Sequence, residues 1–271
     1  RAESIPHELV IVNDSSSDAT PQVIRSFMAA DPNIRTLNRE PPRGFGRAIR
    51  SGLEIVTGDV VIICMADCSD DPRDVVSYYR KIEEGYDCVY GSRFVRGGSV
   101  EHYPPLKLIV NRIVNKCIQL LFWCRFDDLT NAFKAYRTFV LQDCGPFRAS
   151  HFNITIEMSL AALIRSYSIA QVPIAWRGRT WGSSHLNLRE MGRKYLSVLI
   201  KAIAERFLIA DDLIAERMAR WSRQERMLFD VTHQVTDLER RLTAIETTRE
   251  NPDTCLDEPR GSTNRQGDPC P

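Results

Sequence analysis

The chain has 271 residues, of which 43% are hydrophobic and 26% charged, a composition ordinary for a globular protein with one sizeable core. Its formal net charge of +1 excludes a global nucleic-acid signal, so no nucleic-acid partner is expected. The eight cysteines form no paired C-x-x-C, which predicts free thiols in a reducing cytoplasm rather than a zinc site. The polar N-terminus predicts no signal peptide, and no uncharged run reaches the roughly 18–20 residues of a spanning helix.

The N-terminal part of the chain alternates short apolar runs with amphipathic segments. The apolar runs are expected to be strands, at residues 8–13, 34–37, 59–65 and 88–90. The segments between them are expected to be helices, one beginning at Thr20-Pro21 and others at residues 48–56 and 74–84. The run D-V-V-I-I-C-M at residues 59–65 is typical of a strand buried on both faces of a parallel sheet. This order predicts an α/β fold built from right-handed β-α-β units.

Polar clusters follow three of the expected strands, at residues 14–18, 67–71 and 91–93. Ligands of such sheets bind beyond the carboxyl ends of the strands, so the three clusters together predict a binding site. The loop P-P-R-G-F-G-R adds a G-x-G that begins at Gly44 and looks like a phosphate cradle. It matches neither a Walker loop nor a dinucleotide fingerprint, and by itself it is a weak signal.

Asp67 comes directly after the most apolar run and stands among small residues. A carboxylate in this place is suited to bind Mg²⁺ or Mn²⁺, and the cation would neutralise a departing diphosphate. Asp70 and Asp71 lie within one turn of Asp67. They either assist the metal, directly or through water, or cap the next helix, since acidic residues favour helix N-termini.

Two further clusters carry candidates for donor and phosphate binding. Asp14 would accept a hydrogen bond from a nucleoside, with Asp18 and Gly44 as further donor-binding candidates. Turn formation alone also explains the Asp14–Asp18 composition, because Asp and Ser bond their own backbone. Arg93, after Gly91 at a strand end, suits bidentate contact with a phosphate, and the alternative is a surface salt bridge.

Six motifs in order, over roughly residues 8–190, resemble those of family 2 glycosyltransferases. V-N-D-S-S-S-D-A-T resembles V-D-D-G-S-x-D-G-T, M-A-D-C-S-D-D-P stands where the family has D-A-D-L-Q-x-P-P, and G-S-R-F matches G-S-R-[YF]. T-N-A-F-K-A-Y, F-N-I-T-I-E and V-P-I-A-W-R-G-R-T-W-G-S-S-H are similar to S-G-F-[KR]-x-[FY], F-x-[FI]-x-x-E and V-P-I-x-[FY]-x-x-R-x-x-G-x-S-K. Within the family, the set is most similar to polyprenyl-phosphate sugar synthases such as dolichyl-phosphate mannose synthases.

The resemblance implies a GT-A fold, a mostly parallel sheet flanked by helices, and an inverting hexosyltransferase that uses a nucleotide-diphosphate sugar. Carried over by position, Asp14 would contact the nucleoside and Asp67 the Mg²⁺ or Mn²⁺ ion. Arg93 would contact the acceptor phosphate, while Arg179 and Ser184 would close on the donor diphosphate. The expected acceptor is a polyprenyl (dolichyl or undecaprenyl) phosphate.

Three departures from the family pattern bear on activity. Met65 replaces the first Asp of D-x-D and Ser69 replaces the Gln, which leaves Asp67 to hold the metal with water and phosphate oxygens. His185 replaces the lysine of G-x-S-K and removes a permanent positive charge at neutral pH. The family's first strand, with P-x-[YF]-N-E, has no counterpart here, and we expect an exposed sheet edge and an incomplete donor pocket.

The segment Leu106–Cys124 is expected to be a helix near the acceptor. Its polar residues recur every four positions, at Asn111, Asn115 and Gln119. With Arg112 and Lys116 they form a basic stripe on an otherwise apolar helix, suited to a membrane interface near a lipid phosphate; the alternative is a helix packed on the sheet. Arg112 is therefore a second candidate for the acceptor phosphate. A phosphate acceptor is already anionic and needs positioning more than a base, so Glu157 is expected to orient rather than to catalyse.

The domain prediction has three parts: a GT-A domain over residues 1–200, a helical extension over 201–247 and a disordered tail over 248–271. Apolar residues between Leu228 and Ile245 follow an a/d heptad spacing. This seam predicts either a homodimer or a helix packed on its own domain.

Three functions compete on the sequence alone. The leading one is sugar transfer to a polyprenyl phosphate by a cytoplasmic enzyme peripheral to the cytoplasmic membrane face. A transferase with a soluble glycan acceptor is the second. The third, suggested by Met65, His185 and the absent strand, is a non-catalytic relative that binds or regulates a partner. Donor base and sugar cannot be read from these residues.

Overall fold

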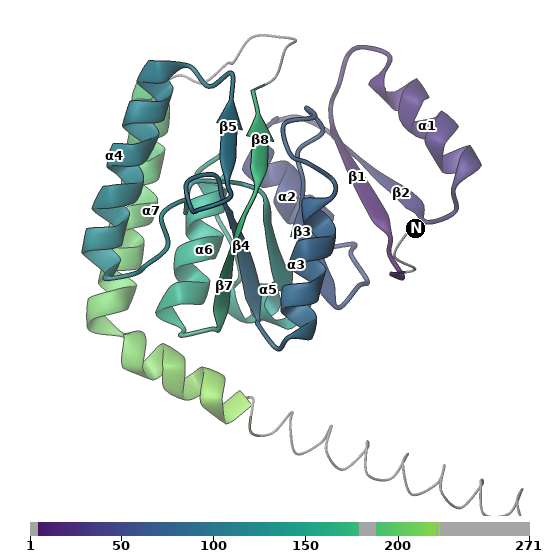
Figure 1. Cartoon of the computed structure of the whole chain (residues 1–271). Coiled ribbons are helices and arrows are strands. Elements are labelled where there is room, and N and C mark those ends of the chain that lie inside the picture. Colours follow the sequence, from purple (N-terminus) through teal and green to yellow (C-terminus); the bar gives the residue numbers. More distant parts are fainter. Residues whose placement is uncertain (1–4, 179–187, 221, 223–271) are drawn as a thin grey trace, which may run out of the picture. The chain divides into compact units, whose positions relative to one another are not determined.

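The computed structural model describes residues 5–178, 188–220 and 222, and the chain divides into two units at Met218. The first unit holds all the named helices and strands (Figure 1). Its strands are β1 (Leu9–Asp14), β2 (Ile34–Arg39), β3 (Val60–Ile63), β4 (Cys88–Ser92), β5 (Ser99–Glu101), β6 (Lys134–Arg137), β7 (Ile169–Pro173) and β8 (Ala175–Arg177). Its helices are α1 (Thr20–Ala30), α2 (Phe45–Leu53), α3 (Asp74–Glu83), α4 (Pro105–Phe122), α5 (Thr138–Cys144), α6 (Ile154–Ile164) and α7 (Leu188–Leu208).

The strands form three sheets. The largest has the order β3-β6-β4-β7, with β6 antiparallel to both of its neighbours and β4 parallel to β7. A parallel pair, β1 and β2, is joined by α1, which confirms the predicted β-α-β unit. The short strands β5 and β8 form a second parallel pair. Three of these ladders are parallel, but the main sheet is mixed.

The prediction that residues 59–65 form a strand buried on both faces of a parallel sheet is wrong in two respects. The strand is shorter, Val60–Ile63, and each of its residues is only half-buried. It pairs with β6 alone, in the antiparallel sense, and therefore has a ladder on one edge only among the described residues. Among the described residues, β1 likewise pairs only with β2. The predicted absence of a family strand stays a prediction.

The core gathers around α6 and the two central strands β4 and β6. Ten of the eleven residues of α6 are buried, including Glu157 and Ser159. An apolar helix of this kind must be covered on all sides, and here α5, α7 and the sheet cover it. Tyr90 of β4 and Tyr136 of β6 are also buried, and both hydroxyl groups reach Ser159, so their polar ends are satisfied inside the core.

The helix predicted at residues 48–56 begins and ends three residues earlier, at Phe45 and Leu53. The sequence-based boundary was wrong because Gly46 was taken as a loop residue. In the structure Gly46 lies in the first turn, where a side chain would overlap the carbonyl oxygen of Ala149. Close approach to this neighbouring backbone, rather than loop flexibility, accounts for the glycine.

None of the described helices is both long and apolar enough to cross a membrane. The second unit, Met218–Pro271, is described only at residues 218–220 and 222. The predicted heptad seam Leu228–Ile245 and the predicted tail lie outside the described residues.

Gly91 offers a test of this packing. A methyl group at Gly91 would overlap the hydroxyl oxygen of Tyr78, which donates to the carbonyl oxygen of Phe133 at 2.9 Å. Gly91→Ala should therefore lower the free energy of unfolding by about 1–3 kcal/mol, measured by urea denaturation. Gly192→Ala, in α7 with open space around it, should instead raise that free energy by about 0.5–1 kcal/mol. Equal effects of the two substitutions would contradict the packing described.

Candidate functional site

A buried ion pair between Arg93 and Asp128 stands at the carboxyl end of β4. The guanidinium donates twice, from Nε to Oδ2 and from Nη2 to Oδ1, each at 2.7 Å, and the backbone N–H of Arg93 adds a third bond at 3.1 Å. The two side chains are 6% and 0% exposed. A buried charge pair needs hydrogen bonds of this geometry to offset the free-energy cost of removing both charges from water.

Aromatic rings surround the Arg93 guanidinium. Phe94, Tyr103 and Trp176 lie with their ring centroids 5.3, 5.5 and 5.6 Å from its central carbon. The ring of Phe94 is shared with Arg112 of α4, at 4.1 Å. These rings come from three separate parts of the chain, and together with Arg112 they bring β4, β8 and α4 together around one cationic group.

The loop 127–131 holds the Arg93 partner in place. Asp127 accepts from Ser92 Oγ at 2.6 Å and from Gln171 Nε2 at 2.7 Å, and its carbonyl accepts from Arg112 Nη1 at 3.1 Å. Asn131 Nδ2 donates to the carbonyl of Gly91 at 3.1 Å. These bonds tie the loop to the end of β4, to its neighbouring strand β7 and to α4. The loop is therefore fixed before any ligand arrives.

Lys134 supports the same loop from inside the protein. Its side chain is fully buried on β6, and Nζ donates to the carbonyl oxygens of Leu129, at 2.8 Å, and Asn131. Burial lowers the pKa of Lys134 to about 7; the charge of Asp128 opposes this and the charge of Arg93 adds to it. A buried amine that is only partly protonated near neutral pH therefore lies directly beneath the ion pair.

The Asp67 loop follows β3. Oδ1 of Asp67 accepts both from the backbone N–H of Ser69, at 3.1 Å, and from its hydroxyl, at 2.5 Å. Ser69, which stands where the resembling family has Gln, thus orients the carboxylate. Between them Cys68 has φ 59°, a left-handed conformation that is uncommon for a residue with a Cβ. The loop is held in a defined and strained shape around Asp67.

Asp70 connects this loop to the surroundings of Arg93 through Trp176, with which it forms an isolated β-bridge and whose ring lies 5.6 Å from the central guanidinium carbon of Arg93. It is buried, and its Oδ2 accepts from the backbone N–H of Met65 at 3.3 Å. Burial raises the pKa of Asp70 to about 6, and the charge of Arg93 partly offsets this rise. The alternative in which Asp70 caps the next helix is not what the structure shows, because its bond goes back to the end of β3. Asp71 instead pairs with Arg73 at the surface.

A cavity of about 280 Å³ opens beside the two loops. Its lining includes charged and aromatic side chains from the Asp67 loop, β5 and β8: Asp70, Asp71, Arg73, Glu101, Trp176 and Arg177. Trp176 and Asp70 belong both to this cavity and to the surroundings of Arg93. The structure therefore brings residues of the clusters at 67–71 and 91–93 near each other, and their joint role in binding stays a prediction.

The third predicted cluster, residues 14–18, forms a separate network with α2. Asp14 accepts from the guanidinium of Arg39 and, at 2.6 Å, from the backbone N–H of Gly44. Asp18 is exposed and accepts from the N–H of Thr20 at 3.0 Å; the Thr20 hydroxyl is the main cause of its lowered pKa. Asp18 therefore bonds its own turn, as the turn-based alternative expected, whereas Asp14 ties the end of β1 to Arg39 and to the start of α2.

The interpretation of Arg43–Arg47 as a phosphate cradle is not supported. The backbone N–H groups of Gly44, Gly46 and Arg47 all donate within the chain, the latter two to the carbonyl of Ser150 at 3.1 and 3.4 Å. A side chain at Gly44 or Gly46 would overlap the backbone of residues 149–151. The glycines allow close packing, and their amides are not aimed at an anion.

The bidentate phosphate contact predicted for Arg93 is also unavailable in this arrangement, because Asp128 takes Nε and Nη2. Sequence reasoning missed Asp127, Asp128 and Lys134, although the adjacent acids in F-D-D-L-T-N and the lysine in T-N-A-F-K were visible. The partners of Asp127 and Asp128 lie in distant segments, so nothing local marked these two acids. Arg179 and Ser184 fall outside the described residues.

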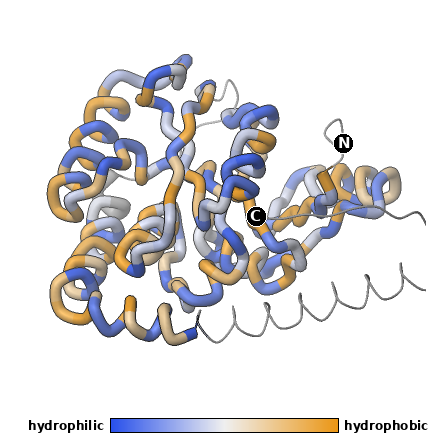
Figure 2. Tube along the Cα trace, turned by 60° about the horizontal axis from the view of Figure 1, so that its bottom comes forward, coloured by the Kyte–Doolittle hydropathy of each residue, from blue (hydrophilic) through white to orange (hydrophobic). Residues whose placement is uncertain are grey.

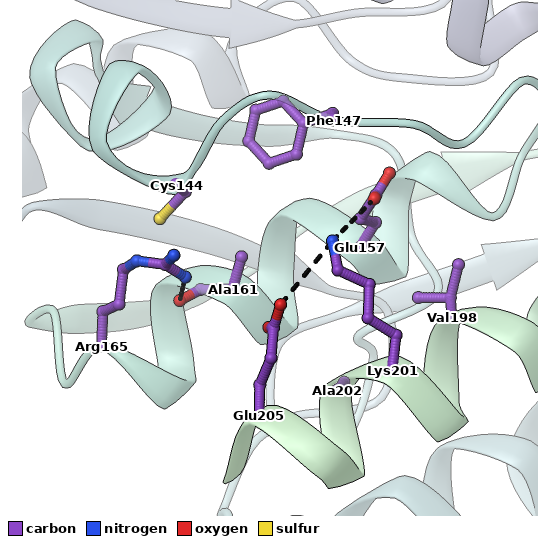
Figure 3. A pocket seen from close by; sticks show the side chains of 9 residues that line it. All are labelled: Cys144, Phe147, Glu157, Ala161, Arg165, Val198, Lys201, Ala202 and Glu205. Atoms are coloured by element: carbon purple, nitrogen blue, oxygen red, sulfur yellow. Dashed lines mark hydrogen bonds and ion pairs between the residues drawn. The ribbon is translucent and has the colours of Figure 1, made fainter. Parts of the chain in front are cut away.

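Glu157 has the orienting role expected of it. Its carboxylate accepts from the backbone N–H groups of Arg148 and Ala149, at 2.8 to 3.1 Å, and lies 3.5 Å from Lys201 Nζ of α7 (Figure 3). Lys201 also reaches Glu205, at 3.7 Å. These contacts fix the loop after α5 and fasten α7 to α6. Glu157 lines the pocket drawn in Figure 3 and does not line the cavity beside the Asp67 loop.

Residues 2–145, more than half of the chain, match the sequence profile described as "Glycosyl transferase family 2". The chain belongs to glycosyl transferase family 2. Two relatives are each 28% identical to this family member. They are the polyprenol monophosphomannose synthase of Mycolicibacterium smegmatis, over 67% of this chain and 72% of the relative, and the dolichyl-phosphate hexose transferase of Haloferax volcanii, over 63% and 70%.

Solved structures confirm the predicted GT-A fold of this family 2 member. Glucosyl-3-phosphoglycerate synthase from Mycobacterium tuberculosis, solved with Mn²⁺, uridine diphosphate and glucosyl-3-phosphoglycerate, superposes with a TM-score of 0.55. It is 21% identical, and the match covers 73% of this chain and 69% of that protein. Identity this low establishes the fold and carries no residue roles.

The described residues fit a divalent cation only if a ligand supplies most of its oxygens. They contain no group of three or more His, Cys, Asp or Glu side chains placed to hold a metal. Asp67 is oriented by Ser69 but has Met65 where the family motif has a second carboxylate. Mg²⁺ in nucleotide enzymes is commonly bound by one or two carboxylates plus phosphates and water, so Asp67 suffices for a metal that arrives with a diphosphate.

Removing one partner of the buried pair should be costly. Asp128→Asn leaves the Arg93 charge buried without its counter-charge, and we expect a loss of about 3–5 kcal/mol in the free energy of unfolding in urea. Glu83→Gln, which breaks the exposed Arg80–Glu83 pair of 3.0 Å, should cost at most about 1 kcal/mol. Similar losses for both variants would show that the buried pair does not organise the site.

Lys134 should titrate near neutral pH. Its folded pKa, about 7, lies below its ordinary value of 10.5, so between these values the folded protein binds fewer protons than the unfolded chain. The contribution of Lys134 to stability therefore rises with pH across that window and is lost as pH falls through about 7. An NMR titration of the lysine side-chain carbons should show one lysine near pH 7, absent in Lys134→Arg. All lysines titrating above pH 9.5 or so would contradict this.

Proposed function

We propose that this family 2 enzyme transfers a sugar from a nucleotide-diphosphate sugar to a polyprenyl phosphate with inversion at the anomeric carbon. The observation that supports this most is that Trp176 lies beside both Asp70 of the Asp67 loop and the Arg93 guanidinium, next to an open cavity. The Asp67 loop is suited to a metal-bound diphosphate, and the surroundings of Arg93 are suited to an anionic acceptor. The two relatives, named for polyprenol and dolichyl phosphate chemistry, support the acceptor class.

On the donor side, Asp67 would hold Mg²⁺ or Mn²⁺ together with the diphosphate. The cation would stabilise the negative charge that develops on the leaving nucleoside diphosphate. Ser69 keeps the Asp67 carboxylate oriented through two bonds to Oδ1, so little reorganisation is needed on binding. Asp70 shares the cavity and is the further candidate for the metal, directly or through water. Arg179 and Ser184 are proposed to close on the diphosphate.

On the acceptor side, the phosphate oxygen is already a nucleophile, and catalysis consists mainly of positioning. Arg93 and Arg112 are proposed to supply positive charge there. Asp128 fixes Arg93 and Phe94 lies between the two guanidinium groups, so both cations are held in defined places. Because Nε and Nη2 of Arg93 are occupied, its contact with phosphate would use the remaining nitrogen or the charge alone.

The nucleoside is proposed to lie along the edge formed by Asp14, Asp18 and Gly44. Asp14 keeps acceptor capacity beyond its two observed bonds, since each carboxylate oxygen has two lone pairs. We further propose the division into a catalytic domain over residues 1–200, a helical extension over 201–247 and a tail over 248–271, with pairing of two chains through Leu228–Ile245. A cytoplasmic location follows from the proposed donor.

The direct test is transfer of radiolabelled sugar from common nucleotide-sugars to a short polyprenyl phosphate with Mn²⁺, using full-length protein. Asp67→Asn should reduce the rate by about 100-fold or more, because a major source of charge stabilisation is lost. Asp59→Asn, an exposed carboxylate before the other end of the same strand, should leave the rate unchanged. Transfer to a soluble glycan instead of the lipid, or no transfer from any donor, would overturn the proposal.

A further inference from the structure

Exposed large apolar side chains are concentrated on two helices. On or directly after α4 they are Leu106, Ile109, Val110, Ile113, Leu120, Leu121 and Trp123. On or directly after α7 they are Leu196, Ile200, Phe207, Leu208 and Ile209. The two helices contact each other and run side by side at one edge of the first unit (Figure 1). An exposed apolar area extending over two helices marks an interaction surface.

The outward face of α4 is its apolar face. Leu106, Ile113 and Leu120 are spaced by seven residues, two helical turns, and therefore share one side of the helix. The opposite side carries the polar contacts: Asn111 and Asn115 both donate to Thr130 Oγ1, at 2.7 and 2.9 Å. The structure thus supports the packed-helix alternative for the polar stripe. The polar stripe packs on the loop of the site, and the apolar stripe faces outward.

Helix α7 is arranged in the same way. Val198 and Ala202 are buried in the core, whereas Leu196, Ile200 and Phe207 are exposed. Their spacing of four and seven residues puts them on one side of the helix. Hydrophobic residues recur along both helices, at the left of Figure 2. We call the exposed apolar residues of α4, α7 and Trp123 the outer apolar face.

The charge of the two helices indicates which partner the outer apolar face binds. Helix α4 has three basic and no acidic residues, and α7 has five basic and two acidic, a combined net charge of +6 in a chain whose formal net charge is +1. The rest of the chain is therefore net acidic. Two copies of this chain would repel each other across such faces, whereas an anionic lipid surface would attract them.

Trp123 has the exposure expected of an interfacial anchor. It follows α4 with φ 48° and is 93% exposed. An indole ring has an apolar body and a polar N–H, and Trp is enriched where hydrocarbon meets headgroups. Its place at the end of the apolar stripe extends the face by one large side chain that has no packing role in the described structure.

We propose that the outer apolar face binds a bilayer containing anionic lipid, with α4 and α7 lying in the headgroup region. Apolar stripes with flanking basic residues are typical of helices that lie in this plane. The inward side of α4 contacts the loop that holds Arg93, so binding would bring a lipid-borne phosphate to the same site. The proposal deepens the proposed function but does not need it, because membrane binding is measured without any substrate.

Vesicle sedimentation tests the proposal with matched variants. Full-length protein should sediment with vesicles of phosphatidylcholine and phosphatidylglycerol, and more weakly with phosphatidylcholine alone. Ile113→Asp and Leu120→Asp together should reduce the bound fraction about tenfold. Phe27→Asp is the control, because Phe27 on α1 and Ile113 are both large apolar side chains with 57% exposure, and Phe27 lies outside the outer apolar face. The control should bind like the unaltered protein.

A second readout separates specific insertion from non-specific adsorption. Vesicle binding should shift tryptophan fluorescence to the blue, and Trp123→Phe should remove most of this shift. Failure to bind anionic vesicles, or equal loss for Phe27→Asp and Ile113→Asp, would overturn the proposal. So would a dimer that Ile113→Asp dissociates in sedimentation equilibrium, since the face would then belong to a second copy. Transfer activity is not measured, so these results stand apart from those for the reaction.

Discussion

The buried pair of Arg93 and Asp128 is the interaction on which the candidate site depends. It joins the end of β4 to the loop 127–131 through three hydrogen bonds. Lys134 supports the loop from below, and Asp127 connects it to Ser92, Gln171 and Arg112. A buried pair contributes little net stability by itself, but it forces its surroundings into one arrangement, because any other would leave a charge unpaired.

The Asp67 loop, the proposed donor side, is held by weaker interactions between residues that are close in sequence. The loop bends back on itself through Ser69, Cys68 and Asp70, and the backbone N–H of Met65 serves as donor to Asp70. With Met65 in place of a carboxylate, the chain supplies one oriented acid and leaves the remaining ligands to the diphosphate and water. Metal and nucleotide should therefore bind together, each strengthening the other.

The sequence predicted features that depend on neighbours in the chain. Apolar runs located β1 to β4, Pro21 located the start of α1, and the ordered motifs identified the family and its fold. It could not predict the partner of Arg93, which lies 35 residues away, or the packing of Gly44 and Gly46 against residues 149–151, about a hundred residues away. The sequence also could not predict that the polar side of α4 faces the protein. Residue periodicity shows that a helix has two different sides, but it does not show which side packs against the core.

The claim that the Asp67 loop and the Arg93 network form one nucleotide-sugar site is tested most directly by calorimetric titration. Uridine and guanosine diphosphates should be titrated into full-length protein with and without Mn²⁺. The account predicts that one of them binds measurably only with the metal, and that Asp67→Asn removes this metal-dependent binding while Asp59→Asn preserves it. Absence of binding for both nucleotides, or binding indifferent to Mn²⁺ and to Asp67→Asn, would contradict the account and favour a non-catalytic member of the family.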